Sequence, residues 1–157
     1  MCEYCGCQSL ETIDELTQEH DEVVRLISHL RPARREGGTV RMAEVAREIA
    51  RVLGPHTVVE EHGLFPALAG DFPDQIAALE AEHRRIEAVL AEAADGMPAD
   101  PAWPERLMEA MAMLRDHILK EQDGVFPAAL ANLSTEEWEV VEATRAKAGS
   151  TLFRPAA

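Results

Sequence analysis

Apolar residues recur along most of the chain at intervals of three and four, the spacing that places side chains on one face of a helix. Such stretches run from about 12 to 30, 40 to 64, 73 to 95 and 105 to 125, and a shorter one opens at Ser134. No run alternates β-branched and polar residues, as a half-buried strand would. The pattern therefore predicts an all-α protein.

Segments rich in Gly and Pro separate these stretches. Residues 31–38 and 95–104 are typical of turns, and Pro66 and Pro127 are expected to end the second and fourth helices. Because the connections are short, consecutive long helices should lie antiparallel. The predicted architecture is an up-down-up-down four-helix bundle with a short C-terminal helix and a Cys-rich N-terminal tail.

The same pattern divides the chain into three parts. Residues 1–11 form the Cys-rich segment, residues 12–133 form the bundle, and residues 134–157 form the short helix and a loose tail. A glutamate three residues after Thr12 and another three residues after Ser134 indicate a capping box at the start of the first and last helices.

Composition and charge exclude several classes of partner. The 157 residues suit one domain, and 29 acidic against 15 basic side chains give a net charge of -14. Such a surface repels nucleic acid phosphates and anionic lipid. No apolar run reaches the ~20 residues of a membrane span, and no basic and apolar leader opens the chain. Three cysteines in one short segment fit a reducing cytoplasm, so we expect a cytoplasmic protein. We also expect a monomer or weak dimer, without nucleic acid or membrane partners.

Each of the four long helices carries one histidine where its apolar stripe should have an aliphatic residue. These histidines are His20, His56, His83 and His117. One such residue would be an ordinary core histidine with its hydrogen bonds satisfied. Four imidazoles that converge in a bundle cannot satisfy one another's ring nitrogens. A metal ion would satisfy these nitrogens, because neutral imidazole is a common metal ligand.

Two of these histidines are followed one helical turn later by a glutamate. His56-x-x-x-Glu60 and His117-x-x-x-Glu121 open two similar phrases, HTVVEEHGLFPAL and HILKEQDGVFPAAL. Residues four apart share a helix face, so each carboxylate should point inward, where it is costly unless it is paired or binds a cation. Four imidazoles and two carboxylates predict two metal ions, each with two histidines and both bridged by the glutamates. Nitrogen and oxygen donors suit iron or manganese, and iron is the better choice for reaction with O2.

The two phrases belong to two similar hairpins. The dipeptide Glu-His recurs at residues 19–20 and 82–83, and the next histidine follows after 36 and 34 residues. Two such hairpins that face each other about a pseudo-two-fold axis would place two equivalent metal ions between them.

This order of residues, with Phe-Pro after each paired motif, resembles the hemerythrin-like (HHE cation-binding) family over roughly Thr12 to Leu130. The resemblance implies a four-helix bundle around an oxo- or hydroxo-bridged pair of non-haem iron ions. It implies as ligands His20, His56, Glu60, His83, His117 and Glu121.

The chain departs from the oxygen-carrying hemerythrins of invertebrates, which have a His-x-x-x-His pair on the third helix and a final His-x-x-x-x-Asp. Here Glu87 stands four residues after His83, where the resemblance would place the missing histidine. Glu87 is either an additional metal ligand or a solvated surface acid. An altered or open metal position favours redox chemistry with peroxide or NO over reversible O2 carriage.

Other residues have more local interpretations. Cys2, Cys5 and Cys7 could bind a second metal or form a reversible disulfide, or could belong to a tail without a specific role. Three thiolates need a fourth ligand to close a tetrahedral site, and the family resemblance does not account for them. The remaining histidines, at positions 29 and 62, should face water, and the phenylalanines at 65 and 126 should close one end of the bundle.

Three functions follow from these features. The first is a diiron protein that binds or senses O2 or NO. The second is a diiron enzyme that decomposes peroxide, reduces NO or donates iron for the repair of iron centres. The third is a thiol-based redox or metal-handling protein that acts through Cys2, Cys5 and Cys7. A structural bundle without metal is the weakest interpretation.

Overall fold

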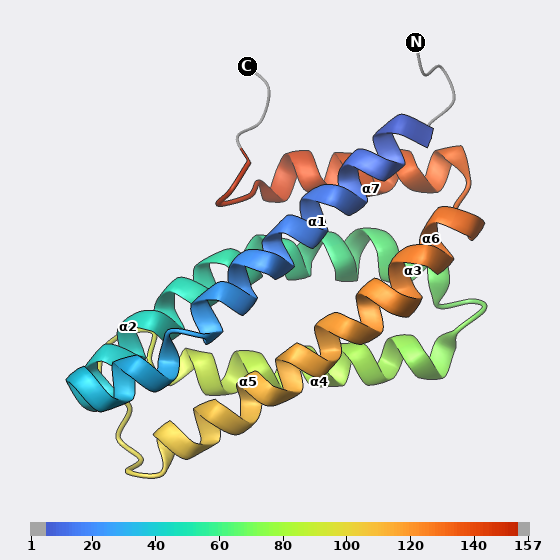
Figure 1. Ribbon diagram of the computed structural model, residues 1–157. Helices are drawn as coiled ribbons and strands as arrows, with labels where there is room; N and C mark the ends of the chain where they lie inside the picture. The colour runs from blue at the N-terminus through green and yellow to red at the C-terminus, as the bar shows by residue number, and fades with distance from the viewer. Residues whose placement is uncertain (1–5, 154–157) are drawn as a thin grey trace.

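The computed structural model describes residues 6–153, with the side chains of 9–153, and in this part of the chain every regular element is helical and none is a strand. The predicted all-α class is therefore confirmed. The long helices lie side by side as a bundle, and α7 (Thr135–Ala148) packs across one side of it, against α2 (Figure 1). These long helices are α1 (Gly6–Ile27), α2 (Leu30–Val59), α4 (Pro73–Ala91) and α5 (Trp103–Lys120).

Two short π-helical segments extend the second and fourth long helices. Segment η1 (Glu60–Leu64) joins α2 to α3 (Phe65–Leu68), and η2 (Glu121–Val125) joins α5 to α6 (Phe126–Asn132). The prediction that the prolines at 66 and 127 end these helices is wrong. A proline has no N–H for the carbonyl four residues earlier, and its ring presses on that carbonyl. The wider π turn accommodates this, and in it the N–H of each preceding phenylalanine donates to the carbonyl five residues back.

The boundary between the first two long helices also differs from the prediction. The chain turns at Ser28 and His29, and most of 31–38 is helical. The interruption within α2 is at Gly38, whose φ of +61° is readily adopted only by glycine. Thr12 lies inside α1 and is not its cap, whereas Ser134 forms the predicted capping box with Glu137.

The buried apolar side chains form two clusters, and the four histidines lie between them. Along α1, for example, Leu16 belongs to one cluster, Val23 belongs to the other, and His20 lies between them. The same holds for His56, which lies between Val52 and Val59. The polar residues therefore form one layer with apolar packing on both sides.

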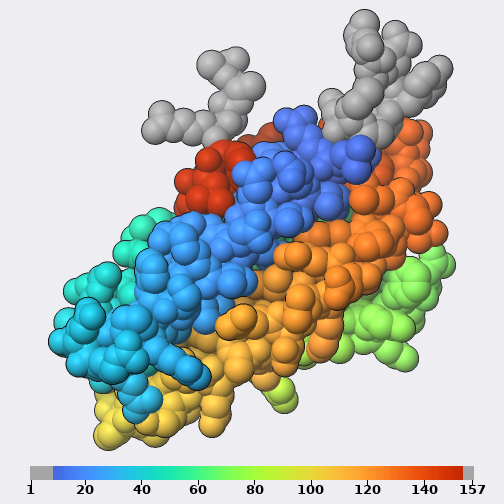
Figure 2. All heavy atoms as spheres, viewed as in Figure 1, coloured from blue at the N-terminus to red at the C-terminus, as the bar shows by residue number. Residues whose placement is uncertain are grey.

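The polar layer is also covered on the face shown in Figure 2. There α1 and α5 meet, and their side chains close over the interior. Among the described residues, no helix is long and apolar enough to cross a lipid bilayer.

Candidate metal centre

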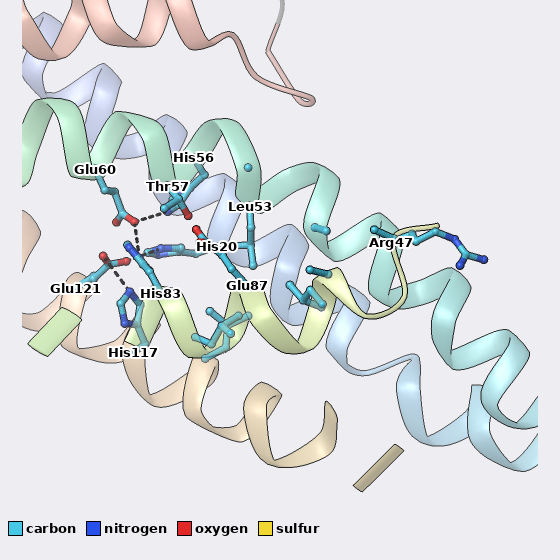
Figure 3. Close-up of a pocket in the computed structure, with 17 residues that line it drawn as sticks. His20, Arg47, Leu53, His56, Thr57, Glu60, His83, Glu87, His117 and Glu121 are labelled. Atoms are coloured by element: carbon cyan, nitrogen blue, oxygen red, sulfur yellow. Dashed lines mark ion pairs between the residues drawn. The ribbon is translucent and has the colours of Figure 1, made fainter. Parts of the chain in front are cut away.

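The six side chains predicted as ligands come together in the buried layer (Figure 3). Each long helix supplies one histidine, and the two glutamates are the first residues of η1 and η2. Their ligand atoms form two groups, and within each group all the ligand atoms lie within 4.8 Å of one another. One group contains His20 and His56, the other contains His83 and His117, and both include Glu60 and Glu121.

Each imidazole turns its Nε2 atom toward a shared carboxylate. His20 Nε2 lies 3.0 Å from Glu121 Oε1, and His117 Nε2 lies 3.2 Å from Oε2 of the same glutamate. Glu60 Oε1 lies 3.4 Å from His56 Nε2 and 3.3 Å from His83 Nε2. Each carboxylate therefore spans the two groups.

The opposite ring nitrogen of every histidine donates to a side-chain oxygen. His56 Nδ1 donates to Glu19 Oε1 (2.9 Å), and His117 Nδ1 donates to Glu82 Oε1 (2.9 Å). Because an ionised carboxylate can only accept, Nδ1 carries a proton in both rings, and in the neutral imidazole the lone pair is then on the inward-facing Nε2.

The remaining two histidines are held by residues of the opposite hairpin. His83 Nδ1 donates to Glu61 Oε2 (2.7 Å), and His20 Nδ1 donates to Gln122 Oε1 (3.0 Å). Phenylalanines of the same two phrases cover these rings, with ring centroids 5.7 Å apart for Phe65 on His83 and 5.4 Å for Phe126 on His20. Both phenylalanines are buried, and they pack directly on the centre, whereas the sequence predicted that they close one end of the bundle.

The inward-facing atoms lack hydrogen-bond partners. Among the described residues, no hydrogen bond is made to His56 Nε2, to His117 Nε2 or to any carboxylate oxygen of Glu60 and Glu121. These imidazole and carboxylate atoms only face one another, at 3.0–3.4 Å. Native proteins rarely leave buried polar atoms unpaired, and carboxylate oxygens facing imidazole lone pairs are a suitable donor set for cations. The residues present therefore fit a pair of metal ions.

Comparison with known protein families matches residues 11–129 to the hemerythrin HHE cation-binding domain. The chain belongs to this hemerythrin family. No curated protein and no solved structure with which the chain was compared gives a match. The family carries a cation-binding function, and the buried His/Glu groups of this hemerythrin-like domain are suited to it.

Without a bound cation, the two central carboxylates are in electrostatic conflict. Burial and the neighbouring Glu60 carboxylate hold the pKa of Glu121 well above its ordinary value. Burial also acts on Glu60, but His56 and other neighbours outweigh it and hold that pKa well below the ordinary value. Burial lowers the pKa of His20 to about 3, so this imidazole is neutral and able to ligate. A pair of cations would relieve the repulsion between the carboxylates.

The supporting carboxylates have partners of their own. Arg145 of α7 binds Glu19 with both terminal nitrogens, each at 2.9 Å, and Ser150 Oγ donates to Glu19 Oε2 at 2.5 Å. Lys120 Nζ donates to Glu82 at 2.7 Å, and Arg84 pairs with Glu61. The segment predicted as a loose tail thus begins with a residue that supports the centre.

The other predicted residues lie away from this cluster or outside the described residues. Glu87 lines the cavity that reaches the centre, but it is in neither group of converging donors. Its side chain is 48% exposed and lies 3.4 Å from Arg84. His29 and His62 are exposed, as predicted. The predicted thiol or second-metal site falls on residues whose side chains are not described, namely Cys2, Cys5 and Cys7.

Sequence reasoning missed the residues that hold Nδ1 of each histidine. A signal was present for all four. Glu19 and Glu82 directly precede a histidine in the repeated Glu-His dipeptide, and Glu61 and Gln122 directly follow the paired glutamates. Nothing in the sequence pointed to Arg145, because it lies far from both repeats and reaches the centre only through the packing of α7.

Proposed function

We propose that this hemerythrin-like protein holds two iron ions, bridged by oxide or hydroxide, and uses them to bind or sense O2 or NO. One observation carries the proposal: two histidine pairs and two shared carboxylates converge, and most of their inward atoms make no hydrogen bond. The four long helices would then form an up-down-up-down bundle around the ions. Imidazole and carboxylate donors without thiolate suit iron, which reacts with O2.

The protein's own residues would bind and orient. His20, His56, His83 and His117 would each supply Nε2, and Glu60 and Glu121 would supply bridging oxygens. When bound, the iron pair supplies the capacity to take up a diatomic ligand and to change oxidation state. The Nδ1 hydrogen bonds select the tautomer that presents Nε2, and apolar clusters pack on both sides of the centre.

For this function we propose that the protein is cytoplasmic and is a monomer or weak dimer. It would have no nucleic acid or membrane partner. The net charge of -14 supports the exclusion of polyanionic partners. The small partners would be O2, NO or peroxide.

The decisive test is metal content together with the absorption spectrum of the protein as isolated. We expect bound iron, and after anaerobic reduction a stable spectral change on exposure to air. Rapid autoxidation, or gas evolution with peroxide, would indicate the diiron enzyme instead. His56→Ala should lower bound iron, whereas His62→Ala, an exposed histidine six residues away, should not. Equal iron content in both variants would refute the ligand assignment.

A further inference from the structure

A cavity of about 410 Å³ extends from the metal centre between α2 and α4. The ligand side chains line one end, and Arg47 lies at the other, well away from them (Figure 3). From Arg47 to Glu60 the chain is helical over 13 residues, which corresponds to about 20 Å at 1.5 Å per residue. Most of the wall between these ends is small or aliphatic, and it includes Ala50, Leu53, Gly54, Ile86, Leu90 and Ala91. The acid Glu87 also lines it, near the ligand end (Figure 3).

Small residues line the outer part of the cavity on both helices, and this part is open to solvent because Gly54 and Ala91 are themselves exposed. Ala50 and Gly54 are four residues apart, so they lie on one face of α2. A Cβ atom placed on Gly54 would meet nothing within 4 Å. On α4 the facing positions include Ala91, at its C-terminal end. Side chains of ordinary core size at these positions would fill the space.

The cavity is too large for a diatomic ligand alone. Its volume is more than ten times the roughly 30 Å³ that one water molecule occupies in the liquid. It falls within the range of about 300–1,000 Å³ that is typical of pockets for organic ligands. Its size and length therefore suit a chain-like organic molecule.

Polarity separates the inner end from the walls. Two divalent or trivalent ions would bring more positive charge than two carboxylates neutralise, and the histidines add none when they are neutral. An anionic oxygen group is therefore favoured at the ions. At the outer end, Arg47 already donates to the carbonyls of Ala93 (2.8 Å) and Gly96 (3.4 Å). That end is a poorer place for an anion.

We propose that this cavity binds linear aliphatic carboxylates, with the carboxylate at the metal ions and the chain along the wall of α2 and α4. The inference rests on the proposed metal centre and adds a class of organic ligand to it. Burial of each methylene in the aliphatic stretch is worth about 0.8 kcal/mol, or roughly a fourfold change in Kd.

The test is a calorimetric titration of the full, iron-loaded chain with straight-chain carboxylates from acetate to decanoate. We expect Kd to fall by up to about fourfold per methylene, and then to level off once the chain reaches the outer end. Equal Kd values for acetate and octanoate would overturn the proposal. Metal-free protein should show no such series; an equal series without metal would place the carboxylate elsewhere and also overturn it.

A matched pair of variants locates the chain. Ala91→Leu narrows the outer part of the cavity and should make Kd level off at a shorter chain, while acetate binds as before. Ala88→Leu adds the same side chain at an exposed position of α4 that does not line the cavity, and it should keep the full dependence. A full dependence in Ala91→Leu would refute the location. Failure of the unaltered chain to take up iron would refute the proposed function itself, so the two failures are distinguishable.

Discussion

The two halves of the centre present the same ligands but support them differently. In the first half, the carboxylate that orients His56 is Glu19, which is 1% exposed and is bound by Arg145, itself only 12% exposed. In the second half, the equivalent carboxylate, Glu82, is bound by Lys120, which is 55% exposed. A buried ion pair and a solvated ion pair differ greatly in how much stability is lost when the pair is broken.

A second difference concerns the other histidine of each half. Glu61 holds His83 through a carboxylate, whereas Gln122 holds His20 through a neutral amide. A carboxylate acceptor makes an imidazole a stronger ligand. The ion beside His83 and His117 should therefore be bound more tightly than its neighbour.

The helix α7 causes part of this asymmetry. It packs on η1, where a Cβ atom on Gly63 would lie 3.2 Å from Val141 Cα. The equivalent Gly124 of η2 has nothing within 4 Å of such an atom. The repeated glycine is thus required for close packing in one copy only. Residues outside the repeated hairpins, and outside the 11–129 family match, make the halves unequal.

The largest expected effect comes from a carboxylate that both halves share. Glu121→Gln should lower the metal bound at both positions, whereas His56→Ala should chiefly affect one. Because burial and Glu60 raise the pKa of Glu121, ionising it at neutral pH destabilises the metal-free fold, and Glu121→Gln should raise the Tm of metal-free protein. Metal analysis and melting curves with chelator test this; full occupancy in Glu121→Gln would contradict it.

Next in size is the contrast between the two supporting cations. Arg145→Met leaves the buried Glu19 carboxylate without its main partner and should lower the free energy of unfolding by about 3–5 kcal/mol. Lys120→Met removes an exposed partner and should cost less than about 1 kcal/mol. Urea unfolding of the two variants measures the contrast, and equal costs would show that burial does not distinguish the halves.

The same buried carboxylate gives a pH dependence. Burial alone would raise the pKa of Glu19, but hydrogen bonds from His56 and Arg145 outweigh it and lower the pKa to about 2, from an ordinary 4.5. The stability that ionised Glu19 contributes is present above pH 4.5 and is lost as the pH falls toward 2. The difference in unfolding free energy between the unaltered chain and Glu19→Gln should shrink over this range, and a constant difference would exclude the shift.

A smaller effect should follow from exchanging the two unequal supports. Glu61→Gln should weaken the ion held by His83 about 10–100-fold, and Gln122→Glu should tighten the ion held by His20. Competition with a chelator, using zinc to avoid redox changes, resolves the two affinities. Equal affinities for the two ions in the unaltered chain would contradict the tighter binding expected beside His83 and His117.

The smallest expected effect concerns Ser150. Its hydroxyl gives Glu19 one hydrogen bond of 2.5 Å, and Ser150→Ala should cost about 1 kcal/mol by urea unfolding. The neighbouring Thr151→Ala is a control, since Thr151 is exposed. Indistinguishable variants would show that the residues after α7 add nothing to the centre.

The sequence allowed the helical class, the long apolar stripes and the meeting of six donor side chains to be predicted. These predictions rest on local information. Helical spacing places residues four apart on one face, and a histidine that interrupts an apolar stripe is visible within its own helix. The same local rules failed at Pro66 and Pro127, where they predicted helix ends. A π turn is stabilised by its surroundings and has no clear signal in the local pattern.

By itself, then, the sequence determined which donors face inward, because helical periodicity depends only on neighbours along the chain. Tertiary structure decided which imidazole each supporting oxygen holds. Glu19, Glu61, Glu82 and Gln122 adjoin ligand residues in the sequence but reach histidines on other helices. Tertiary structure also decided that Arg145 supports one half and Lys120 the other. Such pairings depend on how separate helices pack, and no spacing along the chain encodes that distance.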